Sequence, residues 1–329
     1  MSSPLLEVKD LRTEFRTRDG VVRAVNSISF ELGAGEALGF VGESGSGKSV
    51  TALSILRLFG PFTDARISGQ VIYDGQDLSK FGGKKMRKIR GREIGMVFQD
   101  PLTSLNPLMP VGQQVAECIR LHESVSHDIA DRRATELLEL VGIPDPKNRS
   151  NDLPHSFSGG MRQRIMIAIA VACKPRLLIA DEPTTALDVT VQAQILLLLN
   201  DLQRELGMAL IMISHDFGVI AATCDRVNVM YGGRIVEQAF TKELFRSANH
   251  PYTEGLLKLV PSLDQRRGEQ LVPISGQPPD AFETLPGCSF APRCPHVVDV
   301  CQEKQPDITV LGPSHGSACW KADERRTKR

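Results

Sequence analysis

The chain has 329 residues, more than one small domain needs, and its 41% hydrophobic and 24% charged residues give it the composition of a globular rather than a disordered protein. Its 39 basic and 39 acidic side chains cancel, which disfavours a protein that mainly binds nucleic acid. The N-terminus has no basic segment followed by an apolar one, and the longest apolar run, residues 165–173, is far shorter than the roughly 20 residues of a membrane helix. We therefore expect a cytoplasmic chain that does not itself cross a bilayer.

Hydrophobic periodicity predicts two strands joined by the turn Arg18-Asp19-Gly20, and then strands that alternate with helices. The predicted strands cover residues 5–15, 21–30, 37–41, 70–75, 94–98, 177–180, 208–213 and 226–230, and the predicted helices cover residues 48–58, 159–173 and 189–206. Residues 111–141 have helical spacing and many charges, so we place a helical subdomain at about residues 100–157. This order of elements predicts an α/β fold with parallel strands.

A glycine-rich loop follows the predicted strand 37–41 and matches the pattern GxxxxGKS. The loop consists of Gly42, Glu43, Ser44, Gly45, Ser46, Gly47, Lys48 and Ser49. Its glycines let several backbone N–H groups point at one anion, and the start of the next helix adds the positive end of its dipole. Lys48 is suited to reach the β- and γ-phosphates of a nucleotide, and the Ser49 hydroxyl is a suitable Mg²⁺ ligand. The strand–loop–helix setting favours this site over a flexible loop with a surface lysine.

Two adjacent acids end the predicted strand 177–180. Asp181 lies where it can hold Mg²⁺ through water, and Glu182 lies where it can polarise an attacking water. Alone, the pair is equally compatible with a solvated strand end. Together with the phosphate loop, it indicates a site that hydrolyses a nucleotide.

Residues 157–164, with the sequence FSGGMRQR, precede this strand and form a second helix start rich in small residues. With the phosphate loop and the two acids, they resemble the ABC transporter ATPases, whose signature is commonly LSGGQ. The resemblance covers residues 5 to about 240 and implies a RecA-like P-loop core with an antiparallel β subdomain and a helical subdomain. It also implies that the signature binds ATP held by a second, homologous ATPase subunit. The signature residues are Ser158, Gly159, Gly160, Met161 and Gln163, with Met161 in place of the usual glutamine.

Three further positions match family motifs in the family's order. Gln99 corresponds to the glutamine that contacts Mg²⁺ and the water, Asp188 to the acid of the D-loop at the dimer interface, and His215 to the histidine that contacts the γ-phosphate. The resemblance thus implies Glu182, His215 and Gln99 as catalytic residues and Ser49, Gln99 and Asp181 as Mg²⁺ ligands.

Two expected nucleotide contacts depart from the family's usual pattern or are hard to assign to a residue. Val50 stands where the family usually has threonine, so a hydroxyl contact to the α-phosphate is either absent or supplied by Thr51. The aromatic side chain that stacks on adenine is expected in the first hairpin, where Phe15 is the candidate. Packing in the core is the alternative role of Phe15.

A chain without a membrane span needs separate transmembrane subunits, which is the arrangement of bacterial importers. Residues 100–107 and His250-Pro251-Tyr252 resemble the ATPase subunits of oligopeptide and dipeptide permeases. The resemblance implies that this chain forms a heterodimer with a second ATPase and assembles with two transmembrane permease subunits. An extracytoplasmic substrate-binding protein takes part indirectly. This chain would lie at the cytoplasmic face of the inner membrane, and no nucleic acid would be involved. It implies ATP-driven uptake of oligopeptides or dipeptides. An importer of nickel chelates, opines or sugars, or a soluble regulatory or repair ATPase, remains the alternative.

Proline and cysteine become frequent in residues 249–329, an appendage to the nucleotide-binding domain 1–248. Cys288, Cys294, Cys301 and Cys319 are spaced more widely than the C-x₂₋₄-C pairs of zinc sites, and four thiolates suit an iron–sulfur cluster. Permease ATPases with a similar segment 287–295 bind a 4Fe-4S cluster there, so the resemblance implies one here. Zinc and free thiols are the alternatives.

Overall fold

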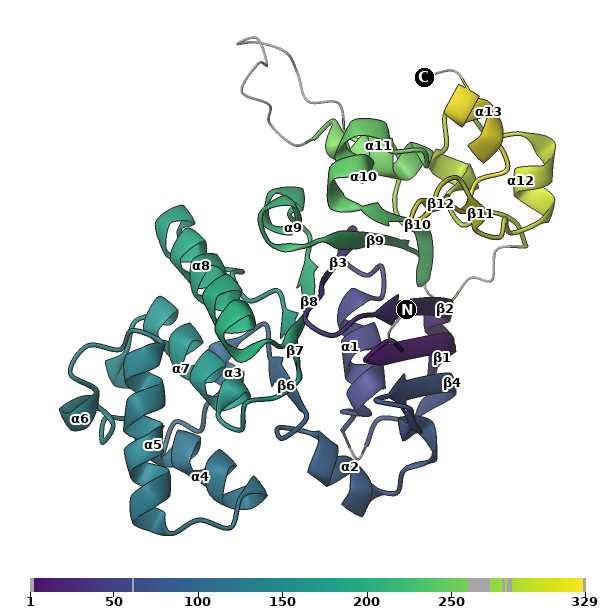
Figure 1. Cartoon of the computed structure of the whole chain (residues 1–329). Coiled ribbons are helices and arrows are strands. Elements are labelled where there is room, and N and C mark those ends of the chain that lie inside the picture. Colours follow the sequence, from purple (N-terminus) through teal and green to yellow (C-terminus); the bar gives the residue numbers. More distant parts are fainter. Residues whose placement is uncertain (1–2, 61, 260–272, 280–281, 283–285, 328–329) are drawn as a thin grey trace. The chain divides into compact units, whose positions relative to one another are not determined.

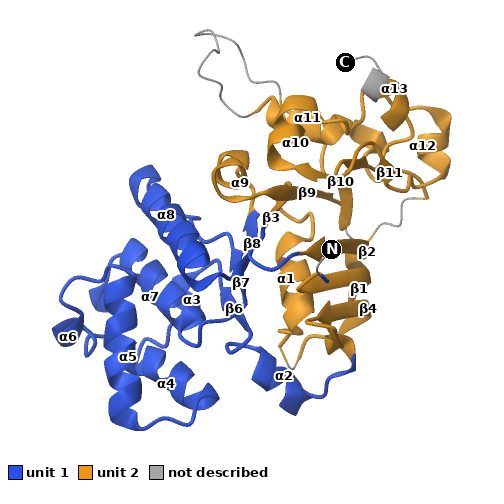
Figure 2. Ribbon diagram, viewed as in Figure 1, with its two compact units in different colours: residues 1–3, 33–37, 80–213 blue, residues 4–32, 38–79, 214–329 orange. Residues whose placement is uncertain are grey.

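The computed structural model describes residues 3–60, 62–259, 273–279, 282 and 286–327, which belong to two compact units (Figures 1 and 2). Unit 1, blue in Figure 2, combines residues 1–3, 33–37 and 80–213, and unit 2, orange, combines residues 4–32, 38–79 and 214–329. Each unit is therefore built from separate stretches of the chain. The C-terminal residues 249–329 fall in the same unit as the phosphate loop.

Unit 2 contains a four-stranded antiparallel sheet with the strand order β2-β1-β4-β5. Its strands are β1 (Leu6–Thr17), β2 (Gly20–Leu32), β4 (Ala65–Tyr73) and β5 (Gln76–Asp77). β1 buries Leu6 and Val8 before a bulge at Asp10, where φ is 48°. After the bulge it buries Leu11 and Thr13, because the extra residue shifts the inward positions by one. The predicted hairpin and antiparallel subdomain are confirmed, and β4 is longer than predicted.

A second group of strands in unit 2 has the order β11-β12-β10-β9-β3. These strands are β3 (Ala37–Val41), β9 (Arg226–Tyr231), β10 (Arg234–Phe240), β11 (Thr309–Val310) and β12 (Gly316–Ser317). The described helices of the unit are α1 (Lys48–Leu56), α9 (Phe217–Thr223), α10 (Thr241–Ser247), α11 (Pro251–Leu257), α12 (Asp299–Glu303) and α13 (Ala322–Thr327). A 3₁₀ turn lies at Ala291–Arg293. β3 pairs in parallel with β9 and is buried along its whole length, as the apolar run predicts. β10 returns antiparallel to β9 and was not among the predicted strands.

Unit 1 contains three parallel strands in the order β8-β7-β6. The strands are β6 (Ile94–Val97), β7 (Leu177–Asp181) and β8 (Ala209–Ser214), and the helices are α2 (Gly83–Ile89), α3 (Pro101–Ser104), α4 (Val111–His122), α5 (His127–Leu140), α6 (Pro146–Arg149), α7 (Gly159–Val171) and α8 (Val189–Leu206). The limits of α8 are those predicted, because Asp188 caps its first turn and Gly207, with φ of 61°, ends it. None of the described helices is both long and apolar enough to span a membrane.

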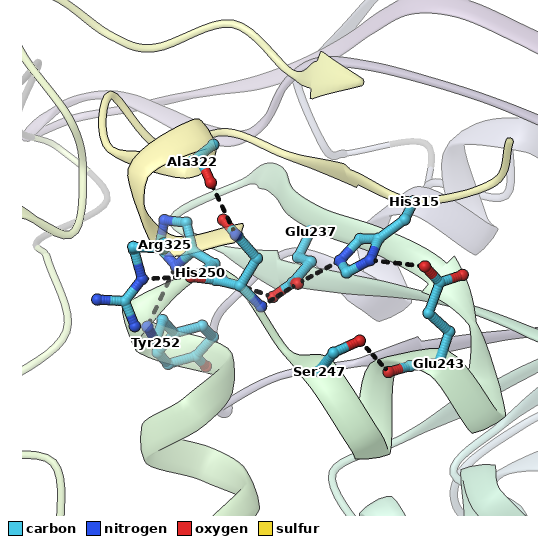
Figure 3. A network of polar contacts seen from close by, with 9 residues as sticks. Glu237, Glu243, Ser247, His250, Tyr252, His315, Ala322 and Arg325 are labelled. Atoms are coloured by element: carbon cyan, nitrogen blue, oxygen red, sulfur yellow. Dashed lines mark hydrogen bonds and ion pairs between the residues drawn. The ribbon is translucent and has the colours of Figure 1, made fainter. Parts of the chain in front are cut away.

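A buried carboxylate ties the last part of the chain to β10 (Figure 3). Glu237 has no exposed surface, and its oxygens accept hydrogen bonds from the backbone N–H groups of Asn249 at 2.5 Å and His250 at 2.9 Å. Nε2 of His315 lies 2.8 Å from the same carboxylate, and Nδ1 of His315 lies 3.1 Å from the carboxylate of Glu243 on α10. Burial of a carboxylate is tolerated only when such partners surround it. The network therefore holds Asn249, His250 and His315 on the core of unit 2.

The same network predicts that the stability of the fold depends on pH. The hydrogen bond to Glu237 raises the pKa of His315, the charges of Glu237 and Glu243 add to this, and burial opposes it. A histidine whose pKa is higher in the folded state stabilises the fold fully below its unfolded pKa of about 6.5, and this contribution is lost as the pH rises through the folded value. We expect His315→Gln to lower the free energy of unfolding by about 2 kcal/mol at pH 5.5 and by less at pH 8.5.

Denaturant unfolding of the full chain at the two pH values measures this difference. The matched control is His127→Gln, since His127 is exposed at the start of α5 and belongs to no such network among the described residues. An equal loss of stability for His315→Gln at both pH values would contradict the linkage.

Candidate nucleotide-binding and catalytic site

The phosphate loop joins β3 to α1 in unit 2, and glycine is required at two of its positions. The φ angles are 155° at Gly42 and 99° at Gly47, a region that favours glycine. A Cβ at Gly42 would lie 2.2 Å from the carbonyl oxygen of Met230, and a Cβ at Gly47 would lie 2.3 Å from that of Ala24. The backbone around the loop therefore leaves no room for a side chain, and the loop keeps the tight curl that its pattern predicts.

The Lys48 side chain lies along this loop and is only 5% exposed. Its Nζ donates hydrogen bonds to the carbonyl oxygens of Gly42 at 2.8 Å and Glu43 at 2.9 Å, and it lies 3.4 Å from Oγ of Ser46. These oxygens hold the ammonium group within the loop. A phosphate that enters the loop would meet a positioned positive charge.

Thr51 and Phe15, the two residues considered for the less regular nucleotide contacts, each contact other residues of the chain. The Thr51 hydroxyl is 2% exposed and donates a hydrogen bond to the carbonyl oxygen of Gly47 at 2.9 Å. This bond and the burial disfavour Thr51 as a replacement for the hydroxyl that Val50 lacks. The Phe15 ring packs edge to face on Phe59, with ring centroids 5.3 Å apart, so Phe15 contributes to packing in unit 2, the alternative role considered for it.

The acidic pair of unit 1 ends β7. Asp181 is 5% exposed, and Glu182 follows it with φ of 47°, an uncommon conformation for a residue with a side chain. Oε2 of Glu182 accepts hydrogen bonds from Nε2 of Gln99 at 3.1 Å and from the hydroxyl of Thr185 at 2.9 Å. The structure therefore brings together the predicted Glu182 and Gln99, and it adds Thr185. Strained backbone of this kind is often found at functional sites.

The signature region forms the start of α7 in unit 1. The Ser158 side chain accepts a hydrogen bond from the N–H of Met161 at 3.4 Å, and Ser158 and Gly159 are exposed. A Cβ at Gly160 would lie 2.5 Å from Cγ1 of Val191 on α8, so this glycine allows the two helices to pack closely. The exposed part of the signature is available to a partner molecule.

Gln163 differs from the rest of the signature. Its side chain is 2% exposed, and its Nε2 has no hydrogen-bond acceptor among the described residues. The predicted role of Gln163 on the partner's ATP stays a prediction, and this burial weighs against it.

Asp188 and His215 lie on the surface of their units. Oδ1 of Asp188 accepts hydrogen bonds from the N–H groups of Thr190 at 3.1 Å and Val191 at 3.0 Å, and the residue is exposed. His215 is exposed directly after β8. Their predicted roles at a dimer interface and on the γ-phosphate are compatible with this exposure.

The four C-terminal cysteines line one small pocket in unit 2. Burial raises the pKa of the Cys288 thiol to about 11, and the proximity of the other three thiols adds to the shift. His250, Phe290 and Trp320 contribute to the same pocket. The pocket is lined by Cys288, Cys294, Cys301 and Cys319.

The predicted site residues divide between the units. The phosphate loop, Phe15, His215 and the cysteines belong to unit 2, whereas Gln99, Asp181, Glu182, the signature and Asp188 belong to unit 1.

Sequence reasoning missed three side chains next to these residues. Thr185 contacts Glu182, and Tyr252 and Arg293 contact Glu43 in the phosphate loop. Tyr252 and Arg293 are 209 and 250 residues away from Glu43, so no local pattern could reveal them.

Two family models match the chain. The model for the ABC transporter matches residues 25–185, and the model for the oligopeptide/dipeptide transporter, C-terminal region, matches residues 236–301. The first match contains the phosphate loop, the signature and the acidic pair. The second begins within β10 and ends at Cys301.

Named relatives resemble the chain over nearly its whole length. A probable peptide ABC transporter ATP-binding protein of Sinorhizobium fredii is 53% identical, with coverage of 97% of this chain and 96% of that protein. The dipeptide transport ATP-binding protein DppD of Bacillus subtilis is 48% identical, with coverage of 98% and 96%. The oligopeptide transport ATP-binding protein OppD of Escherichia coli is also 48% identical, with coverage of 97% and 94%.

A solved structure shares the fold. The ATP-binding cassette MJ0796, in a dimeric post-hydrolysis state bound to ADP and Pi, has a TM-score of 0.64 at 27% identity, with coverage of 72% of this chain and 98% of that one. This likeness confirms the predicted α/β core with its antiparallel β subdomain and helices.

Proposed function

This chain belongs to the ATP-binding proteins of peptide ABC transporters, and on that basis we propose that it hydrolyses ATP to drive the uptake of oligopeptides or dipeptides across the bacterial cytoplasmic membrane. The observation that carries the proposal is the joint presence of the ATPase segment and the oligopeptide/dipeptide C-terminal region in one chain. Each relative named above carries the word peptide, dipeptide or oligopeptide in its name. The alternatives of another cargo or of a soluble regulatory or repair ATPase have no such support.

In the proposed reaction, the phosphate loop binds the triphosphate and Lys48 neutralises part of its charge. Ser49, Gln99 and Asp181 would hold Mg²⁺, which would supply charge stabilisation for the phosphate oxygens. Glu182 accepts a proton from the attacking water, and the hydrogen bonds from Gln99 and Thr185 orient its carboxylate. His215 stabilises the charge that develops on the γ-phosphate.

We propose that a second, homologous ATPase subunit completes each catalytic pocket. The dimer of the similar cassette supports this arrangement, and the exposed Ser158 and Gly159 are free to meet ATP on that partner. Asp188 lies at the same interface. Two transmembrane permease subunits and an extracytoplasmic binding protein complete the transporter, with this chain as a peripheral subunit on the cytoplasmic face and with no nucleic acid.

Reconstitution tests the proposed function. The chain is combined with the membrane proteins, second ATPase and binding protein encoded beside it, and ATP hydrolysis is measured with panels of peptides, nickel chelates, opines and sugars. Stimulation by peptides, with ATP-dependent accumulation of labelled peptide in vesicles, supports the proposal. Stimulation by one of the other cargo classes alone would assign the transporter to that class instead.

We further propose that the four C-terminal cysteines hold a 4Fe-4S cluster. Their common pocket supports this ligand set. The spacing of the four cysteines is wider than the paired cysteines of zinc sites, which favours a cluster over zinc. A cluster of four irons spreads its thiolates more widely than a single ion does.

Protein purified without oxygen is expected to contain about four iron and four labile sulfide per chain. Cys294→Ser should lose most of the iron, whereas Cys118→Ser on α4, outside this pocket, should retain it. Iron and sulfide analyses with visible absorption spectra measure this. Stoichiometric zinc, or a chain with neither metal, would contradict the proposal.

A further inference from the structure

The phosphate loop contains an acidic side chain that calls for a structural explanation. Glu43 directly follows Gly42, and its side chain is 28% exposed. A carboxylate beside the phosphates of ATP would repel them, since like charges in a site of low dielectric interact strongly. A loop that binds ATP therefore needs this charge to be compensated or directed away.

Arg293, from the cysteine-containing part of the chain, compensates this charge. Nη1 of Arg293 donates to Oε2 of Glu43 at 2.7 Å, and Nη2 donates to Oε1 at 3.0 Å, so the ion pair is bidentate. The Arg293 side chain is only 4% exposed. Such a pair has a fixed geometry, which a single lysine could not reproduce.

The remaining donors of Arg293 are also occupied. Nε donates to the carbonyl oxygen of Ser275 at 3.0 Å, Nη2 to that of Ile274 at 3.2 Å, and Nη1 to the hydroxyl of Tyr231 at 3.4 Å. With the two bonds to Glu43, this accounts for all five N–H donors of a guanidinium group. Ser275, Ile274 and Tyr231 thus hold the Arg293 side chain in place, and Arg293 in turn fixes the carboxylate of Glu43.

The main chain of Glu43 is held as well. Its N–H donates to the hydroxyl of Tyr252 at 2.8 Å, and Tyr252 is fully buried, with its ring 4.6 Å from that of Tyr231. The carbonyl oxygen of Glu43 accepts a hydrogen bond from Nζ of Lys48 at 2.9 Å. A displacement of Glu43 would therefore move the lysine that contacts the phosphates.

From these contacts we infer that Arg293 is a positioning residue for ATP binding: it neutralises Glu43 and keeps the phosphate loop in its binding conformation. The C-terminal region is then part of the ATP site of this chain rather than a separate attachment. The inference rests on the proposed binding of ATP at this loop.

Equilibrium binding of MgATP to the purified full chain tests the inference. We expect Arg293→Gln to raise the dissociation constant about thirtyfold, because it leaves Glu43 uncompensated beside the phosphates. Glu43→Gln loses the anchor without the repulsion and should raise the constant only about threefold. The double variant should match Glu43→Gln, so that removal of the carboxylate rescues the loss of the arginine.

In the assembled transporter, Arg293→Gln should raise KM for ATP by a similar factor and leave kcat within about twofold, since the residues of the chemical step are unchanged. The control is Arg133→Gln, which breaks another bidentate arginine–glutamate pair, with Glu123, in unit 1. It should leave MgATP binding unchanged. If Arg293→Gln does not fold, Arg293→Lys keeps the charge but loses the bidentate geometry and should raise the constant about tenfold. Adding Glu43→Gln should then return it to the roughly threefold rise of Glu43→Gln alone.

A double variant that binds MgATP as weakly as Arg293→Gln, or equal affinity of Arg293→Gln and wild type, would overturn the inference alone. A wild-type chain that does not bind MgATP would overturn the proposed function together with it. Wild-type binding is therefore measured first.

Discussion

Replacement of Glu182 by glutamine is expected to lower ATP hydrolysis by the assembled transporter roughly a thousandfold, which is within the range for loss of a general base. The amide retains an oxygen that can accept the hydrogen bonds from Gln99 and Thr185, so the local structure of unit 1 should persist. It cannot take a proton from water. ATP should still bind, and turnover should stop with the nucleotide unhydrolysed.

Steady-state phosphate release and the amount of bound ATP after gel filtration measure the two halves of this expectation. Glu139→Gln, an exposed position on α5, is the matched control and should hydrolyse ATP at the wild-type rate. Normal turnover by Glu182→Gln in the full complex would show that another group activates the water.

Replacement of Gly47 by alanine should abolish useful ATP binding and destabilise unit 2. The new Cβ would lie 2.3 Å from the carbonyl oxygen of Ala24, and the backbone has φ of 99°, so both the contact and the conformation are unfavourable. Backbone atoms cannot move aside as a flexible side chain can. We expect a loss of roughly 3 kcal/mol in the free energy of unfolding and at least a tenfold weaker affinity for MgATP.

Gly35→Ala separates the two causes. Gly35 also has a positive φ, 72°, but a Cβ there would have no atom within 4 Å. This control should lose only about 1 kcal/mol and keep its affinity for MgATP. Thermal unfolding and equilibrium nucleotide binding measure both variants, and equal behaviour of the two would exclude steric crowding at Gly47 as the cause.

The parts of the fold that could be predicted from the sequence are those that local chemistry determines. β3 is an uninterrupted apolar run before a glycine loop, and α8 lies between a capping Asp188 and the left-handed Gly207. Both therefore have the limits that the sequence indicates. Gln99 and Glu182 are each expected near the attacking water, and the structure brings them into contact because they follow neighbouring parallel strands.

The missed features depend on residues far apart in the chain. β10 contains Glu237, a charged residue that normally indicates a surface, and its burial is possible only because His315 and two backbone N–H groups reach it. The burial of Gln163, whose role at a partner's ATP stays a prediction, was likewise not visible from its position in a motif. No periodicity in a single sequence records such long-range compensation.

The short pairing of β12 with β10 has a consequence for the effect of C-terminal truncation on this protein. Glu237 and Gln238 of β10 face Ser317 and Gly316, so the C-terminal region covers what would otherwise be the rim of that group of strands. Exposed edge strands present unpaired backbone N–H and C=O groups to other molecules and promote self-association. A chain truncated after residue 248 is therefore expected to aggregate, even if its phosphate loop still forms.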